Sequence, residues 1–178
     1  EDLMATIDLI VLGILKQEPL SAYDIQKLVE YRNISRWVKI STPSIYKKVL
    51  QLEEKGLIKS TLVREGKMPE KAVYSLTKAG ESQWENLMLE ISEKPIHFFL
   101  DFNAVIVNLA GLTPEHQARC LANIENNIRT LKAYLEENIR QKEAEPDIPE
   151  TGMAVLRQQY TLAQAVETWI ATLKKDFG

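Results

Sequence analysis

Apolar side chains near the start of the chain recur every three or four residues, which is the spacing of a single buried helical face. Ile7 and Val11 follow this pattern, and it predicts a first helix over about residues 5–16. Ser21 is a good N-cap for a second helix, because its hydroxyl can accept a hydrogen bond from a free backbone N–H. This second helix is expected to extend to about residue 31.

A third helix is predicted to begin at a serine, threonine and proline and to end near Lys55. Ser41 or Thr42 can cap it, and Pro43 suits the first helical position because its missing N–H is not needed there. Gly56 follows the last helical residue and is a typical stop signal.

Beyond this glycine the period changes to the alternation of β-strands. Residues 57–64 and 72–76 are predicted to form two strands, and residues 65–70 form a loop that contains Gly66 and Pro69. Three helices followed by a basic hairpin is the order of a winged helix-turn-helix.

The next signals divide the chain into two regions. Thr77 is expected to cap a fourth helix that runs to about Glu93, and Pro95 marks a boundary. We therefore predict a mainly α fold with a small β-hairpin. Residues 1–93 form an N-terminal winged helix-turn-helix domain, and residues 94–178 form a helical dimerisation domain.

Three helical stretches are expected in the second region, over residues 97–110, residues 113–143 and the C-terminal end of the chain. The last of them carries an apolar ladder of near-heptad spacing. The predicted dimerisation residues lie on this ladder and are Met153, Leu156, Tyr160, Val166, Ile170 and Leu173. A second subunit can cover them, but packing against the same chain around residues 124–135 is an equally good alternative for any one of them.

The charge of the chain is unevenly distributed. The net charge is −3 and the pI is about 5.6, which is unusual for a nucleic-acid binder. Residues 32–78 nevertheless hold eleven Lys/Arg against four Asp/Glu, whereas residues 92–178 hold nine against twelve. A local positive excess of this kind can bind phosphates while the remaining surface keeps the protein in solution.

The third helix has one apolar sector and one polar sector. Ile45, Val49 and Leu52 fall together and are expected to point inward. The polar sector has no acidic residue and holds Ser44, Lys47, Lys48 and Gln51. Hydroxyl, ammonium and amide groups can contact both phosphates and base edges.

These residues belong to a predicted DNA-binding surface that also includes the N-terminal end of the helix, a tyrosine and the basic hairpin. Its other members are Ser41, Thr42, Tyr46, Arg64, Lys67 and Lys71. The alternative interpretation is a solvated helix face and an ordinary charged turn, and the combination of both features in this order favours DNA binding.

Several segments resemble the PadR family of bacterial transcription regulators. Residues 37–46 (WVKISTPSIY) and 50–58 (LQLEEKGLI) are similar to the family's recognition-helix motif, and residues 73–80 (VYSLTKAG) are similar to the segment after the wing. The resemblance spans about residues 7–80. The chain departs from the family in having Lys47 where a proline is frequent.

The resemblance implies a homodimeric regulator, usually a repressor, whose paired C-terminal helices set the spacing of two recognition helices. A palindromic operator in double-stranded DNA follows from such two-fold symmetry. Some longer family members respond to phenolic acids, so a small aromatic effector is a further expectation. Its candidate lining is aromatic and comprises Trp84, Phe98, Phe99, Phe102 and Trp169, and the alternative is that these residues are core or interface.

The sequence contains no constellation that favours an enzyme, a metal site or a cofactor. His97 and His116 have no Cys or His at ligand spacing, and Cys120 lies on the apolar stripe of its helix. The single cysteine and the absence of a long apolar run are typical of a cytoplasmic protein that does not enter the membrane. A winged-helix module for protein–protein contact, without DNA binding, is the alternative function.

Overall fold

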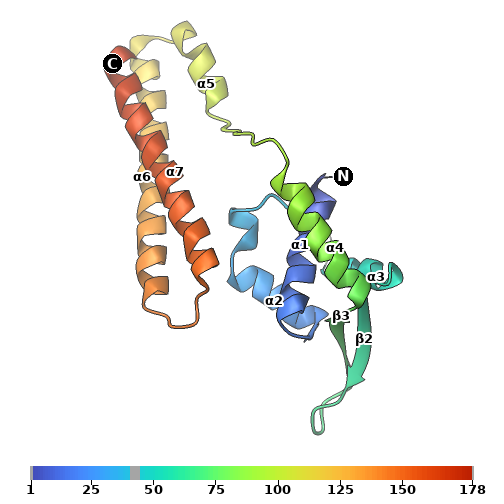
Figure 1. The fold of residues 1–178 in the computed structure, drawn as a ribbon. Helices are drawn as coiled ribbons and strands as arrows, with labels where there is room; N and C mark the ends of the chain where they lie inside the picture. The colour runs from blue at the N-terminus through green and yellow to red at the C-terminus, as the bar shows by residue number, and fades with distance from the viewer. Residues whose placement is uncertain (1, 41–44, 178) are drawn as a thin grey trace. The chain divides into compact units, whose positions relative to one another are not determined.

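The computed structural model describes residues 2–40 and 45–177, and it divides them into two compact units. The first unit extends to Ile96 and the second begins at His97. Figure 1 shows the mixed helix–sheet unit and the long helical hairpin, which are described separately below.

The N-terminal unit combines four α-helices with a small antiparallel sheet. Its elements are α1 (Asp2–Gln17), β1 (Leu20–Ser21), α2 (Ala22–Tyr31), the 3-10 helix η1 (Ile34–Arg36), α3 (Ile45–Glu54), β2 (Ile58–Val63), β3 (Lys71–Leu76) and α4 (Lys78–Ser92). This order confirms the winged helix-turn-helix that the sequence predicts. The short strand β1 was not predicted, because two residues are too few to establish an alternating pattern.

Side-chain caps and a left-handed glycine define the ends of these helices. The Ser21 hydroxyl accepts a hydrogen bond from the Asp24 backbone N–H at 3.2 Å. The Thr77 hydroxyl accepts one from the Gly80 N–H at 3.0 Å and donates to the Gly56 carbonyl at 2.7 Å. Gly56 has a φ of 73°, which glycine adopts without steric cost at the end of a helix. Thr77 therefore ties the start of α4 to the turn that follows α3.

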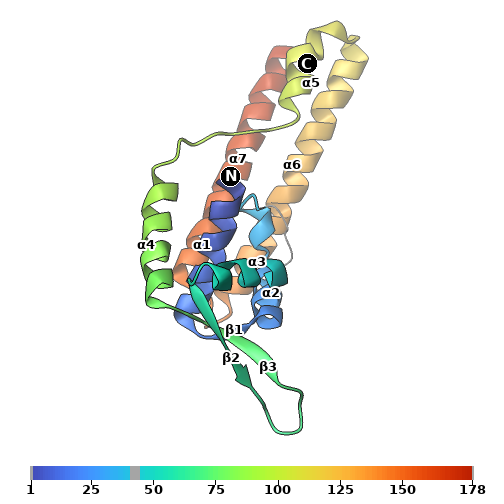
Figure 2. The same cartoon turned by 90° about the vertical axis from the view of Figure 1, so that its right-hand side faces the viewer.

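The sheet order is β1-β3-β2, with both neighbouring pairs antiparallel. Tyr74 in β3 lies opposite Leu20 in β1 and Ser60 in β2. The β2–β3 hairpin projects from the helices, as Figure 2 shows. Its base contributes to the core, because Ile58 and Tyr74 are both buried.

One apolar cluster holds the N-terminal unit together. Val11 and Leu12 of α1, Ile25 of α2 and Leu52 of α3 are each fully buried in it. Burial of a side chain of this size stabilises a fold by about 1.5–3 kcal/mol. The three helices are thus fixed by their apolar stripes, and the outer side of α3 is left at the surface.

The C-terminal unit is dominated by a long antiparallel hairpin of two helices. Its elements are α5 (Asn103–Asn108), the 3-10 helix η2 (Leu109–Gly111), α6 (Pro114–Glu143) and α7 (Glu150–Phe177). The Thr113 cap and the end of α6 at Glu143 agree with the sequence prediction. None of the helices within the described ranges is long and apolar enough to span a bilayer.

The predicted helix over residues 97–110 is wrong in its first half. The structure has no helix from His97 to Leu100, and α5 begins only at Asn103. Phe98 and Phe99 are 71% and 86% exposed. A short helix is marginal unless it packs an apolar face against a partner, and these aromatic side chains have little packing within their own unit.

The α6–α7 interface has an apolar core and a polar edge. Ile170 of α7 is fully buried in a cluster with Leu109, Leu121 and Ile124. Leu131 of α6 is 45% exposed, although it lies four residues before the buried Leu135.

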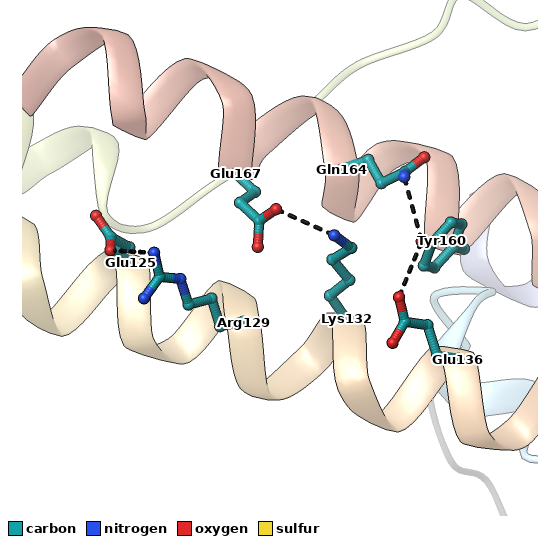
Figure 3. A network of polar contacts seen from close by, with 7 residues as sticks. All are labelled: Glu125, Arg129, Lys132, Glu136, Tyr160, Gln164 and Glu167. Atoms are coloured by element: carbon teal, nitrogen blue, oxygen red, sulfur yellow. Dashed lines mark hydrogen bonds and ion pairs between the residues drawn. The ribbon is translucent and has the colours of Figure 1, made fainter.

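Along the polar edge, Lys132 of α6 forms an ion pair with Glu167 of α7 at 3.1 Å. The Tyr160 hydroxyl donates to the Glu136 carboxylate at 3.0 Å (Figure 3). These contacts fix the register of the two helices, because each joins one particular residue of α6 to one particular residue of α7.

Candidate nucleic-acid interface

The centre of the candidate site is α3, which the core holds by one side only. Ile45, Val49 and Leu52 are buried, as predicted from their spacing. Tyr46 is 48% exposed, Lys47 is exposed as well, and both lie on the outward side of the helix. A helix with an exposed ammonium and phenol beside a fully anchored apolar stripe is suited to contact a ligand at the surface.

The predicted surface also includes Gln51 and three residues at the start of the helix. Gln51 is half-buried, so its amide lies at the edge of the exposed face. Ser41, Thr42 and Ser44 were predicted to contact DNA at the start of the helix, and they lie outside the described residues.

Lys48 corrects the sequence prediction. Its side chain is 1% exposed, and its Nζ lies 2.7 Å from Oδ1 of Asp8 in α1. The ammonium is therefore enclosed between two helices and is not available to a phosphate at the surface. Asp8 was not predicted as a functional residue, although an acidic residue within the first apolar stripe indicates that a buried cation faces it.

The hairpin supplies a second exposed basic region. Arg64 and Lys67 are exposed in the loop between β2 and β3, where Gly66 has a φ of 59° and the Met68 N–H donates to the Glu65 carbonyl at 3.1 Å. The loop is drawn at the free end of the hairpin in Figure 2. Arginine and lysine at such a tip can reach a groove or the flanking phosphates.

Lys71 is exposed, and its ammonium lies near two carboxylates. Its Nζ lies 3.9 Å from Oδ2 of Asp24 in α2 and 3.9 Å from Oε1 of Glu65. Exposed ion pairs of this length are weak, so the ammonium can exchange these carboxylates for a phosphate. Lys59 was not predicted as part of this surface, but it is exposed on β2 and belongs to the same basic segment.

The six predicted dimerisation residues are divided by the structure. Met153 and Ile170 are buried within their own chain, so these two correct the prediction of an intersubunit contact. The other four are half-buried, namely Leu156, Tyr160, Val166 and Leu173. Packing of α7 on α6 accounts for the inward part of the ladder and leaves its outer edge at the surface.

The aromatic residues considered for an effector are divided between the two units. Phe102 and Trp169 stack with their ring centroids 5.8 Å apart in the C-terminal unit. Trp84 belongs to the N-terminal unit, where the Lys16 ammonium lies 4.9 Å from its ring centroid. A shallow groove on α6 and α7 is lined by polar and small residues, among them Arg129, Glu167 and Thr172.

The two histidines and the cysteine lie in stacking, capping and packing contacts. His97 stacks on Phe99 at 5.9 Å, and the His116 backbone N–H donates to the Thr113 cap at 3.3 Å. Cys120 is half-buried beside the apolar cluster of the hairpin. In the part of the chain that the structure describes, no three His, Cys, Asp or Glu side chains form a group that could hold a metal ion.

One family model matches part of the chain. Residues 11–86 match the family model described as the transcriptional regulator PadR-like family. No curated protein sequence matches the chain significantly.

Solved structures match over nearly the whole chain. Bacillus subtilis PadR in complex with operator DNA is 18% identical, with a TM-score of 0.81 over 97% of this chain and 99% of that one. Bacillus subtilis PadR in complex with p-coumaric acid is 17% identical, with a TM-score of 0.79 over 94% and 95%.

The Vibrio cholerae virulence activator AphA is 23% identical, with a TM-score of 0.67 over 95% of this chain and 96% of that one. At these identities the structural matches establish the fold. Residues 11–86 are therefore similar to the PadR-like family, and the chain has the fold of Bacillus subtilis PadR.

Proposed function

We propose that the protein is a homodimeric, sequence-specific DNA-binding transcription regulator and not an enzyme. The observation that carries this proposal is the exposed pair Tyr46 and Lys47 on a core-anchored α3, together with Arg64 and Lys67 at the end of the hairpin of the same unit. In this proposal α3 enters the major groove and the hairpin contacts the flanking phosphates or minor groove. Residues 1–93 bind DNA, and residues 94–178 hold the dimer together.

The proposed sign of regulation is repression. The chain shares its fold with a PadR protein solved on operator DNA, which supports binding to a defined site. A dimer that covers a palindromic operator blocks the binding of other proteins there. Because AphA, of the same fold, is an activator, the sign is tested separately with a promoter–reporter fusion in cells that carry or lack the protein. Higher reporter output without the protein supports repression.

A small aromatic acid is the proposed effector, bound in the C-terminal domain. The support is the similarity to PadR in complex with p-coumaric acid. Phe98 and Phe99 are exposed within their unit and are available to form a wall of a site in the assembled dimer. Release of bound DNA by a panel of phenolic acids tests this part of the proposal. Activity in the cytoplasm follows from the need to reach DNA.

The experiment that tests DNA binding begins with selection of a duplex from a random library by the full chain. Fluorescence anisotropy then compares the selected duplex with a scrambled one across a salt series. The proposal predicts tight binding to the selected duplex that weakens steeply with salt, because phosphate contacts release counterions. Equal weak binding to both duplexes would favour the alternative of a protein-interaction module.

A further inference from the structure

The N-terminal unit contains a buried ion pair that the proposed DNA contacts do not use. Lys48 of α3 and Asp8 of α1 lie 2.7 Å apart, with side chains 1% and 14% exposed. Among the described residues, no hydrogen bond reaches Asp8 Oδ1, so the Lys48 ammonium is the group that neutralises it.

Asp8 lies within the apolar stripe of α1, and Lys48 lies at the edge of the apolar stripe of α3. On α3, Lys48 lies between Ile45 and Leu52, which are both buried. On α1, Asp8 precedes the fully buried Val11 and Leu12 by three and four residues. An apolar pair at these positions would join the core without the cost of removing two charges from water.

A buried ion pair differs from apolar packing in its directionality. Apolar surfaces tolerate small rotations and slides of one helix over another, because their attraction depends on area. An ammonium and a carboxylate in contact fix one point of each helix, since separating them leaves a buried charge without a partner. Buried polar groups are best attested as devices that set the register of packed helices.

The ion pair lies next to the exposed side chains of α3 that are proposed to contact DNA bases. Lys48 follows the exposed Lys47 directly and Tyr46 by two residues. Rotation of α3 about its axis would move these side chains relative to the base edges in the major groove of DNA. Base edges are recognised only when the hydrogen-bond donors and acceptors of protein and DNA are aligned. Phosphate contacts are less demanding, because a lysine ammonium is a point charge on a flexible stem.

We propose that the Asp8–Lys48 pair is a positioning device that sets the rotation of α3 against α1 and thereby the sequence selectivity of the protein. The pair itself touches no DNA. Its loss relaxes the discrimination between operator and other sequences while the phosphate-based affinity remains. This inference rests on the proposed function, since it concerns how α3 reads DNA.

The test measures selectivity and folding on the same samples. The wild-type chain is first compared on its selected duplex and on a scrambled one. In the double variant Asp8→Leu with Lys48→Met, apolar side chains replace both charges, and Asp8→Asn removes one charge at constant volume. Glu85→Gln is the control, because it removes an exposed carboxylate of α4 in the same unit.

The expected result is a folded double variant whose ratio of operator to scrambled affinity falls about ten-fold, the contribution of one base contact. Its affinity for scrambled DNA stays within about two-fold of wild type, since the phosphate contacts are retained. Asp8→Asn shows the same loss of selectivity, and Glu85→Gln shows none.

A folded double variant, or a folded Asp8→Asn protein, that keeps the wild-type ratio overturns the inference, because packing alone would then position α3. A wild-type chain that fails to distinguish the two duplexes overturns the proposed function instead, and the inference falls with it. The two failures are distinguishable because the second appears before any variant is made.

Discussion

Lys47 and Lys48 are adjacent residues on α3 with different surroundings. Lys47 is exposed, whereas the Lys48 side chain is enclosed at 1% exposure against Asp8. At about 100° per residue, Lys48 falls at the border between the polar and apolar sectors of the helix. A side chain at this border can point toward the solvent or toward the core. The Lys48 side chain points toward the core, because the Asp8 carboxylate on α1 attracts its ammonium.

At this scale the first prediction concerns Lys47→Ala. It should weaken operator binding about ten-fold and lower the salt slope by about one, because a single phosphate or base contact is lost. Anisotropy titrations across a salt series measure both quantities. Lys175→Ala, which removes an exposed lysine from α7, is the matched control. An unchanged slope in the Lys47 variant would remove α3 from the proposed interface.

Gly80 allows α4 to approach the backbone of Leu57, the residue before β2. A Cβ at this position would lie 2.0 Å from the Leu57 carbonyl oxygen, which is a backbone atom and cannot move independently. We expect Gly80→Ala to destabilise the protein by about 1–3 kcal/mol or more, the typical cost of overpacking. Urea denaturation followed by circular dichroism measures the change.

The control for this variant is Gly152→Ala in α7, where a Cβ would meet no atom within 4 Å. Alanine in an open helical position should be neutral or stabilise by up to about 1 kcal/mol. If both variants unfold at the same urea concentration, the close contact at Gly80 is not a constraint on the fold.

At the scale of elements, the local signals that predicted helices were caps and apolar spacing. Ser21, Thr77 and Thr113 each cap the helix that the sequence assigned to them. The prediction over residues 97–102 failed because apolar composition alone does not make a helix when no partner face is present. The burial of Lys48 could not be derived from α3 alone, since its cause lies on α1.

The α6–α7 interface has a charge contact with a defined pH dependence. The hydrogen bond from Lys174, aided by Arg129, lowers the pKa of Glu125 below its ordinary value of 4.5. A carboxylate with a lowered pKa stabilises the folded state above its unfolded-state pKa, and this contribution disappears as the pH falls through the folded-state value. The hairpin should therefore lose stability below about pH 4.5.

Glu125→Gln should lower the melting temperature of the hairpin slightly at neutral pH and make its acid dependence shallower. Trp169 fluorescence follows the melting of this unit, because the indole stacks on Phe102. Asp176→Asn removes an exposed carboxylate from α7 and is the control. The same acid profile in the Glu125 variant and in wild type would argue against this ion pair as a stabilising contact.

At the scale of the whole molecule, the chain separates its charges between its units. The basic excess lies in the segment that contains α3 and the hairpin, and the C-terminal helices are acidic. The sequence alone shows this division of charge. The partner of each apolar residue on α7 could not be predicted, because the same ladder fits a neighbouring helix of its own chain or a second subunit.

Dimerisation is tested on the outer side of α7. Leu162 is 39% exposed, so Leu162→Glu leaves the intrachain core intact and places a charge in an intersubunit contact. We expect this variant to shift the protein from dimer to monomer. Operator binding should weaken as well, because a monomer contacts one half-site and lacks the avidity of a dimer that contacts two. Analytical ultracentrifugation gives the molar mass.

The control is Ala171→Glu, which adds the same charge on the opposite side of α7, four residues before Lys175. A Leu162→Glu protein that remains dimeric would exclude this side of α7 from the interface. A more drastic removal of α7 would be uninformative, since Leu121 and Ile124 of α6 would lose their cover.

The most direct test of DNA binding by α3 and the hairpin is amide hydrogen exchange of the full chain with and without its selected duplex, with scrambled DNA as the reference. Amides of the hairpin loop are expected to exchange rapidly in the free protein, because the loop is exposed and lies outside the β2–β3 pairing. We predict that the selected duplex slows exchange over residues 45–54 and 64–71 and leaves the middle of α6 unchanged. Protection confined to α6 and α7, with none on α3 or the hairpin loop, would contradict the proposed interface.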